Sequence, residues 1–260
     1  MENKTIVATV ADFKYLRKNL DQFIFELRNN GKFEGSLLII TSFFTPTFLF
    51  KSIKKDGNII IKRFSKIKFS RGTEKIFRNL YTGEEMNRHS SKRFQWHKLH
   101  LFDAKLKKWK YVFYLDINMR IHSEIGLILE NKPENSLHAR CDSYPKFEKL
   151  LSSQFDRTHQ KYQNLSDKFD LNTSNYFQTG VMYFDTSIIF NDTKQKILEL
   201  VERFPISTTN EQGILNIYFK YLENKYIELE TEVGDYLTYY YWLVENKKII
   251  ITKQNRFKYK

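Results

Sequence analysis

Short apolar runs alternate along the chain with segments in which apolar residues recur every three or four positions. The first run, residues 5–11, is rich in β-branched side chains and predicts a buried strand. Asp12 follows it as a helix cap, and apolar positions at helical spacing continue through residues 13–27. This helix should stop at Asn29-Asn30-Gly31, because asparagine and glycine favour helix ends.

The same alternation continues through most of the chain. Strands are predicted at residues 37–41, 58–61, 111–115 and 176–184, and helices at residues 93–106, 187–203 and 209–222. Strands that alternate with helices indicate an α/β fold with a mostly parallel central sheet flanked by helices. We find no linker-like stretch, and the pattern therefore favours one domain over residues 1–260. The polar segment 152–174 is predicted to be an insertion or a loop.

Composition agrees with a folded domain. The 260 residues are 41% hydrophobic and 16% aromatic, which excludes a wholly disordered chain. The net charge of +13 raises the possibility of a nucleic-acid-binding module. However, residues 51–110 contain 18 Lys and Arg against 5 Asp and Glu, and the rest of the chain is balanced. No helix-turn-helix, zinc-finger or RNA-recognition signature accompanies this basic segment, so nucleic acid is the less favoured partner.

Cysteine content and apolar run lengths bear on the compartment. Cys141 is the single cysteine, which suits a reducing environment. We see neither a signal peptide nor an apolar run long enough to span a bilayer, so we expect a cytoplasmic protein with no membrane span. There is also no P-loop and no Gly-x-Gly-x-x-Gly motif, which disfavours triphosphatases and Rossmann dehydrogenases.

The chemistry is concentrated at the end of the predicted strand 111–115. Asp116 follows that strand directly, and Asn118 lies two residues further on. Ligands of open α/β sheets bind at the carboxyl ends of strands. There, the side-chain oxygens of Asp116 and Asn118 could hold a divalent cation against a diphosphate. The alternative is that Asp116 only caps the next segment.

This arrangement resembles the glycogenin-like, retaining glycosyltransferases of the GT-A fold. In that family a Lys-Leu-His-type helix precedes a strand that ends in an Asp-x-Asp motif. Here Lys98-Leu99-His100 precedes Asp116-Ile117-Asn118. The resemblance implies a Rossmann-like nucleotide-diphospho-sugar transferase, with a nucleotide-binding half at residues 4–120 and a donor-sugar and acceptor half at residues 121–260.

Four further segments follow the order of the same family. They are Ala8-Thr9-Val10 with Tyr15, Ala139-Arg140-Cys141-Asp142, Phe177-Gln178-Thr179-Gly180-Val181 and Asn210-Glu211-Gln212-Gly213. The resemblance implies that Ala8, Thr9 and Tyr15 hold the base. It also implies that Gln178 and Thr179 line the donor site, and that Asp142, Glu211 and Gln212 face the reacting sugar.

The basic segment acquires a role from the same comparison. Arg93 and Lys98 lie in the helix that leads to Asp116, where positive charge would stabilise a departing diphosphate. The implied reaction is hexosyl transfer from a UDP-sugar to a carbohydrate or glycoprotein acceptor. Mn²⁺ or Mg²⁺ would be held by Asp116 and Asn118, and family relatives often form homodimers.

Several positions depart from the family pattern. Asn118 replaces a carboxylate, which predicts weaker metal binding, and no histidine follows His159 to complete a metal site. Glu211 and Gln178 stand where the family has aspartate and asparagine. Two alternatives therefore stay open: a sugar-nucleotide-binding protein without turnover, and a basic nucleic-acid-binding module.

Overall fold

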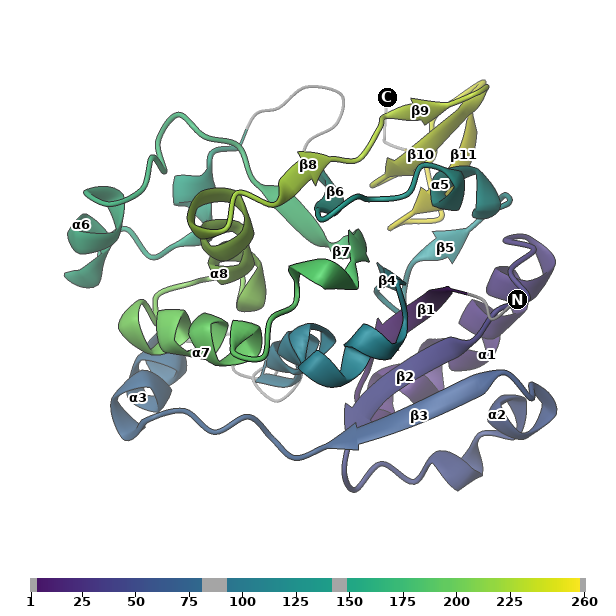
Figure 1. The fold of residues 1–260 in the computed structure, drawn as a ribbon, viewed down its shortest axis with the longest axis horizontal. Coiled ribbons are helices and arrows are strands. Elements are labelled where there is room, and N and C mark those ends of the chain that lie inside the picture. The colour runs from purple at the N-terminus through teal and green to yellow at the C-terminus, as the bar shows by residue number, and fades with distance from the viewer. Residues whose placement is uncertain (1–3, 81–92, 142–148, 258–260) are drawn as a thin grey trace.

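The computed structural model describes residues 4–80, 93–141 and 149–257. Within them the strands are β1 (Thr5–Val10), β2 (Leu37–Ser42), β3 (Ile59–Phe64), β4 (Tyr111–Leu115), β5 (Arg120–Ile121), β6 (Leu137–Cys141), β7 (Phe177–Asp185), β8 (Tyr226–Glu228), β9 (Glu232–Val233), β10 (Tyr236–Tyr240) and β11 (Lys248–Thr252). Seven of them form the central sheet in the order β3-β2-β1-β4-β7-β6-β8 (Figure 1). Strands β3, β2, β1 and β4 run parallel, whereas β7 is antiparallel to both of its neighbours.

The α-helices are α1 (Phe13–Asn29), α2 (Lys51–Lys55), α3 (Arg71–Leu80), α5 (Gly126–Glu130), α6 (Lys161–Ser166), α7 (Thr193–Arg203) and α8 (Glu211–Asn216). Shorter 3-10 segments are η1 (Thr47–Leu49), η3 (Trp96–Phe102), η4 (Ala104–Lys108), η5 (Leu151–Gln154) and η6 (Thr186–Ile188), and η7 (Ile217–Leu222) is a π-helical turn. The predicted α/β fold with a mostly parallel sheet is confirmed.

Helix α1 begins as its sequence predicts. Oδ1 of Asp12 accepts a hydrogen bond from the backbone N–H of Tyr15 at 2.8 Å, which satisfies one of the first amides of the helix. At the other end, the N–H groups of Asn30 and Gly31 both donate to the carbonyl of Glu26. The cap fixes the direction in which the chain leaves β1, and so places Tyr15 beside the carboxyl end of the sheet.

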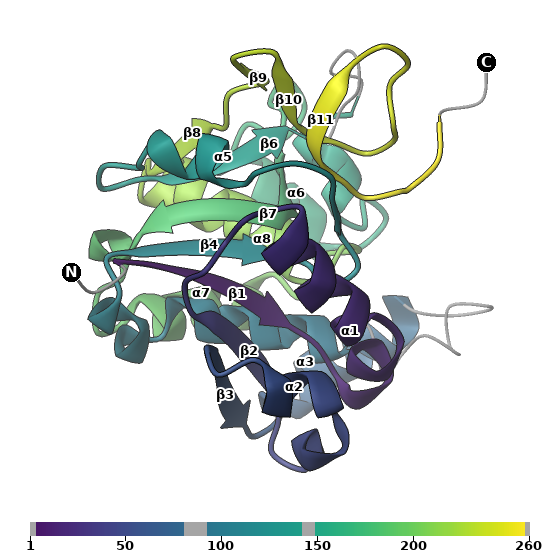
Figure 2. The ribbon, with the colours of Figure 1, turned by 90° about the vertical axis from the view of Figure 1, so that its right-hand side faces the viewer.

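Alternate residues of the central strands enter two apolar cores, one on each face of the sheet. Ile6 and Ala8 of β1 join the core that contains residues of η3, α7 and α8, whereas Val7 joins the core that contains α1 (Figure 2). In β4, Tyr114 faces the first core and Phe113 the second. This two-sided burial explains why the strands read as continuous apolar runs rather than as alternating patterns.

The helical predictions differ from the structure mainly in helix type and boundaries. The segment 93–106 is largely 3-10 in character, with a break at Asp103, whose side chain accepts from the N–H of Lys105. The helix predicted at 187–203 begins only at Thr193, because η6 precedes it. The helix predicted at 209–222 is split into α8 and the π-helical turn η7.

A second, four-stranded sheet was not predicted. Its order is β5-β11-β10-β9, and Ile250 and Ile251 of β11 pack into the same core as α1. Strand β5 follows Asp116 by a few residues and pairs with β11, so this sheet brings the chain after Thr252 back to the carboxyl end of β4. Figure 2 shows three of its strands, β9, β10 and β11, in olive to yellow, beside β6 and α5.

The polar segment 152–174 is anchored to the body of the protein. It contains part of η5 and all of α6, and Leu165 and Leu171 are buried in the first core. No helix in the described ranges has the length and apolar character needed to cross a membrane.

Candidate active site

The site is centred on Asp116, the first residue after β4. Its backbone N–H donates to the carbonyl of Gly180 on the neighbouring antiparallel strand β7, at 2.8 Å. The two chains approach closely here: a Cβ added to Gly180 would lie 2.5 Å from Cε of Met119 and 3.4 Å from Oδ2 of Asp116. A side chain at position 180 would force the buried Met119 side chain to move, so the small glycine allows β7 to pass close to the Asp116 carboxylate.

The Asp116 carboxylate is surrounded by donors. The Tyr114 hydroxyl donates to Oδ1 at 2.6 Å, and Nζ of Lys98 lies 3.1 Å from the same oxygen. Nζ of Lys253 lies 2.9 Å from Oδ2. Burial alone would raise the pKa of Asp116, but the charges of Lys253 and Lys98 together with the Tyr114 hydrogen bond hold it well below its usual range. Asp116 is therefore ionised at neutral pH.

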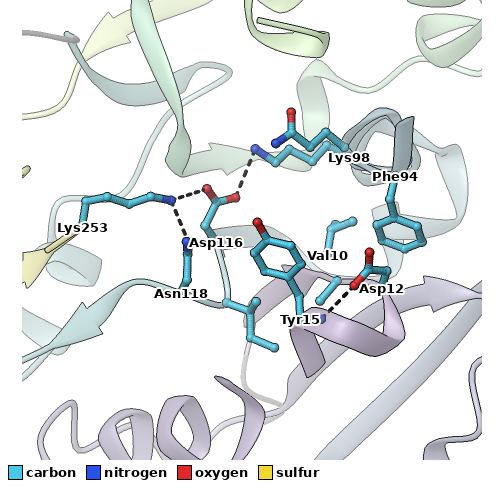
Figure 3. Close-up of a pocket in the computed structure, with 11 residues that line it drawn as sticks. Val10, Asp12, Tyr15, Phe94, Lys98, Asp116, Asn118 and Lys253 are labelled. Carbon is cyan, nitrogen blue, oxygen red and sulfur yellow. Dashed lines mark hydrogen bonds and ion pairs between the residues drawn. The ribbon is translucent and has the colours of Figure 1, made fainter. Parts of the chain in front are cut away.

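Lys253 bridges the two oxygen-bearing side chains that follow β4. Besides its contact with Asp116, its ammonium donates to Oδ1 of Asn118 at 2.8 Å. Figure 3 shows the long side chain entering from the second sheet to reach both groups. The residue lies directly after β11, and its backbone N–H donates to the carbonyl of Tyr240. The second sheet thus delivers a fixed positive charge to the end of the first.

Lys98 forms the other half of this charge cluster. Its Nζ lies 2.8 Å from Oε1 of Glu211 as well as 3.1 Å from Asp116, and it is within 3.4 Å of two oxygens of Thr179. Burial opposes protonation of Lys98, but the adjacent carboxylates of Asp116 and Glu211 raise its pKa above the usual value. The cluster therefore contains two carboxylates and two ammonium groups.

Glu211 and Gln212 begin helix α8, which is tied to β7. The Thr179 hydroxyl donates to Glu211 at 3.0 Å, and the Thr179 N–H donates to Oε1 of Gln212 at 3.1 Å. The Gln212 amide donates to Oε1 of Gln154 at 2.8 Å. Further along α8, the Asn216 side chain bonds both the N–H and the carbonyl of Phe177. These bonds fix the side chains of Glu211 and Gln212 relative to Asp116.

Two pockets that share lining residues adjoin the cluster. The first lies at the carboxyl ends of β1 and β4, and Figure 3 shows Tyr15 and Phe94 around it with Asp12 and Val10. The second extends toward α8. Its lining includes Gln178, Thr179, Glu211, Gln212, Thr209 and Tyr241. Both pockets are lined by Gln95, Lys98, Asp116 and Lys253, so the charged residues stand between an aromatic end and an amide-rich end.

Comparison with known proteins bears on this arrangement. No protein-family model matches the sequence, and no match is found among curated proteins. Among solved structures, the galactosyltransferase LgtC in complex with donor and acceptor sugar analogues is similar over 86% of this chain and 72% of its own, with a TM-score of 0.54 and 17% identity. Mouse xyloside xylosyltransferase 1 is similar over 96% of this chain and 97% of its own, with a TM-score of 0.55 and 10% identity. The mannosyltransferase Ktr4p from S. cerevisiae is similar over 82% and 65%, with a TM-score of 0.52 and 11% identity.

The chain has the GT-A glycosyltransferase fold. Six of the residues singled out by the family resemblance lie together in this GT-A domain: Asp116, Asn118, Lys98, Thr179, Glu211 and Gln212. Their roles in binding and catalysis stay predictions. Gln178 lines the second pocket, and its Oε1 accepts from the Tyr239 hydroxyl at 2.6 Å.

Other expected site residues of the GT-A domain lie elsewhere. Ala8 and Thr9 are fully buried within β1, because the pocket opens only at the carboxyl end of that strand, at Val10 and Ala11. Arg93 forms an ion pair with Glu74 of α3 and does not line either of the two pockets. Asp142 lies outside the described residues.

The metal site implied by the resemblance does not fit the residues present. Glycosyltransferases of the GT-A fold generally use a divalent cation. Here, however, Lys253 holds the two oxygens of Asp116 and Asn118 that would bind one, and the other Asp116 oxygen accepts from Tyr114 and Lys98. Within the described ranges, no three His, Cys, Asp or Glu side chains gather as a metal site. We therefore assign no step to a metal.

Three residues that line or adjoin the two pockets were not singled out from the sequence: Phe94, Lys253 and Gln154. Phe94 could have been found from its place in the same helical segment as Lys98. Lys253 follows an apolar strand just as Asp116 does, and that position is the signal that could have marked it. Gln154 lies in a polar segment with no motif, and only its contact with Gln212 identifies it.

Proposed function

We propose that this protein is a glycosyltransferase that moves a sugar, with retention of configuration, from a nucleotide-sugar donor to a hydroxyl acceptor. The observation that carries the proposal is that the two pockets adjoin the same charged residues, Lys98, Asp116 and Lys253. An aromatic end, a cationic centre and an amide-rich end follow each other in the order of a base, a diphosphate and a sugar.

The first pocket suits the nucleoside. Tyr15 and Phe94 offer aromatic surface, and base–aromatic stacking typically contributes about 1–3 kcal/mol per base. The pocket ends at Lys98 and Lys253, whose positive charges suit phosphate oxygens. We favour a UDP-sugar as the donor. Mn²⁺ and Mg²⁺ were expected beside it, but the contacts of Lys253 argue against either ion at these oxygens.

The second pocket suits the donor sugar and the acceptor hydroxyl. Glu211 is only 2% exposed, and its Oε2 is buried with no hydrogen-bond partner in the described part of the chain. That oxygen could accept a hydrogen bond from a sugar hydroxyl, while Gln212 orients the ring. Because Oε1 is held by Lys98 and Thr179, Glu211 would be a fixed anion beside the anomeric carbon.

The transfer step can be balanced with the donor's own atoms. The bond from the anomeric carbon to the diphosphate oxygen breaks, and its electron pair leaves with the phosphate. A new bond forms between that carbon and the acceptor oxygen, and the acceptor proton passes to the leaving phosphate. Lys98 and Lys253 would stabilise the negative charge that develops on the diphosphate. Asp142, as an expected contact of the donor sugar, belongs to the same proposal.

A donor survey tests this function. UDP-, GDP- and CDP-sugars would be screened by calorimetric binding and by release of the nucleoside diphosphate, with and without carbohydrate acceptors. Asp116→Ala should abolish donor use, whereas Asp192→Ala, which removes an exposed carboxylate at the start of α7, should not.

Each outcome of the survey has a distinct meaning. Binding of a nucleotide sugar without hydrolysis or transfer would indicate a binding protein without turnover. The absence of nucleotide binding, together with salt-sensitive binding of an oligonucleotide, would instead support the basic nucleic-acid module. Either result would refute the proposed transferase.

A further inference from the structure

We propose that Lys253 takes the place of a divalent cation in this protein, so that the diphosphate of the donor is bound by a built-in ammonium group and without metal. The inference rests on the proposed use of a nucleotide-sugar donor. It concerns how the site neutralises the diphosphate, and it assigns that role to Lys253, a residue that the family resemblance did not identify.

The first support is the position of the Lys253 ammonium. Its Nζ lies 2.9 Å from Oδ2 of Asp116 and 2.8 Å from Oδ1 of Asn118, so it occupies the space between the two oxygens expected to chelate a metal. Mg²⁺ and Ca²⁺ bind oxygens at about 2.0–2.6 Å. An ion on both oxygens would therefore overlap with Nζ, and Lys253 would have to leave first.

The second support is the charge balance. In the family pattern, the formal charges of two carboxylates and one divalent cation sum to zero. Here the charges of one carboxylate, one neutral amide and one ammonium group also sum to zero. Asn118 in place of an acidic residue and Lys253 in place of a metal are therefore matching changes. With two carboxylates, a single ammonium would leave the site with excess negative charge and a weaker attraction for phosphate.

The third support is how Lys253 is anchored. Its backbone N–H donates to the carbonyl of Tyr240 at 3.1 Å, and the next residue, Gln254, donates to that of Tyr241 at 2.8 Å. The base of the side chain is thereby attached to the second sheet, while the tip is held by Asp116 and Asn118. A cation fixed at both ends needs little reorganisation when a ligand arrives.

The fourth support is access. Lys253 lines both pockets, and its side chain is 21% exposed, compared with 8% for Lys98. Lys98 is also engaged by Glu211, so Lys253 is the more accessible of the two lysines. A lysine ammonium has three N–H donors. Among the described residues, two of them are used by Asp116 and Asn118, which leaves the third for a phosphate oxygen.

The test measures nucleotide binding and needs no turnover. UDP, GDP, CDP and ADP would be titrated calorimetrically into the unmodified protein, once in EDTA and once with MnCl₂, and the tightest of the four would be used throughout. The inference predicts that the dissociation constant of this nucleotide in EDTA agrees within about twofold with its value in MnCl₂. Binding that occurs only with Mn²⁺ would overturn the inference and leave the proposed function intact.

Variants then assign the effect to the side chain. Lys253→Met should weaken nucleotide binding in EDTA by about 10- to 150-fold, the range typical of a lost hydrogen bond to a charged group. Lys248→Met is the matched control on the same strand, and it should bind like the unmodified protein because Lys248 is exposed and outside both pockets. Equal binding by all three proteins in EDTA would overturn the inference.

A gain of metal dependence gives an independent readout. Lys253→Asp should bind Mn²⁺ itself, detected by electron paramagnetic resonance without nucleotide, because Asp116, Asn118 and the new carboxylate then offer three oxygens. Mn²⁺ binding by the unmodified protein as tight as by this variant would overturn the inference. Failure of all four nucleotides to bind in either buffer would overturn both the inference and the proposed function.

Discussion

Removing the charge of Lys98 should destabilise the protein even in the absence of any ligand. Nζ lies 2.8 Å from Oε1 of Glu211 and 3.1 Å from Oδ1 of Asp116. At an effective dielectric constant of about 20, unit charges at these separations attract by about 6 and about 5 kcal/mol. The cost of burying the ions offsets much of this attraction. The net loss in Lys98→Met should therefore be about 3–5 kcal/mol, the range seen when one partner of a buried pair is removed.

The loss should fall mainly on Glu211. Asp116 retains Lys253 and Tyr114, whereas Glu211 is 2% exposed and keeps the Thr179 hydroxyl. Neutralising that carboxylate should therefore rescue the variant. We expect Lys98→Met/Glu211→Gln to be more stable than the sum of the single changes by at least about 2 kcal/mol.

This coupling is measured by urea unfolding at pH 7 of four proteins: the unmodified protein, Lys98→Met, Glu211→Gln and the double variant. In thermal unfolding, Lys98→Met should melt about 6–20 °C below the unmodified protein, given about 2–4 °C per kcal/mol for domains approaching this length. The reasoning fails if Lys98→Met costs less than about 1 kcal/mol, or if the double variant is additive within about 0.5 kcal/mol.

Two further predictions concern the packing around the site. Burial lowers the pKa of His97 to about 4 and that of His100 to about 3, and the charge of Lys194 adds to both shifts. Both rings therefore stay neutral in the folded protein at pH 5–7. In the unfolded chain, by contrast, they gain protons below about pH 6.5. Unfolding free energy measured in urea should thus fall by about 2 kcal/mol per histidine from pH 7 to pH 5, and His97→Leu/His100→Leu should remove most of that slope. Gly180→Ala should cost about 1–3 kcal/mol through overpacking against Met119, and Met119→Ala in the same chain should relieve part of it; a fully stable Gly180→Ala would contradict the close approach.

The sequence predicted the elements that owe their structure to local or strongly apolar signals. The strand at 111–115 was placed with its observed bounds, because it is a run of five apolar residues, of which Val112–Leu115 are buried on both faces of the sheet. Asp12 and the Asn29-Asn30-Gly31 stop bounded α1 correctly, since caps depend on residues a few positions apart. Lys98 and Glu211 were placed in the site only through the resemblance, since nothing local joins two residues so distant in sequence.

The second sheet and its lysine depend on tertiary contacts that no local pattern reveals. Strands β5 and β9 are two residues long, and β10 mixes tyrosines with threonine in a pattern that suits a core segment equally well. Lys253 is one of many lysines in a basic chain, and its position beside Asp116 follows from the pairing of β11 with β5. The sequence also could not show that Arg93 pairs with Glu74, because α3 approaches it only in the fold.

The contact between Lys253 and Asp116 also has a consequence for folding kinetics, since it joins residues 137 positions apart. Closing so large a loop costs entropy that only the docking of the second sheet can repay, so this contact should form late. A refolding intermediate that contains only the seven-stranded sheet would present Asp116 without one of its two lysines and should bind nucleotide poorly. Recovery of nucleotide binding should therefore lag behind the burial of Trp96 in the first core, and the delay would report the arrival of the second sheet.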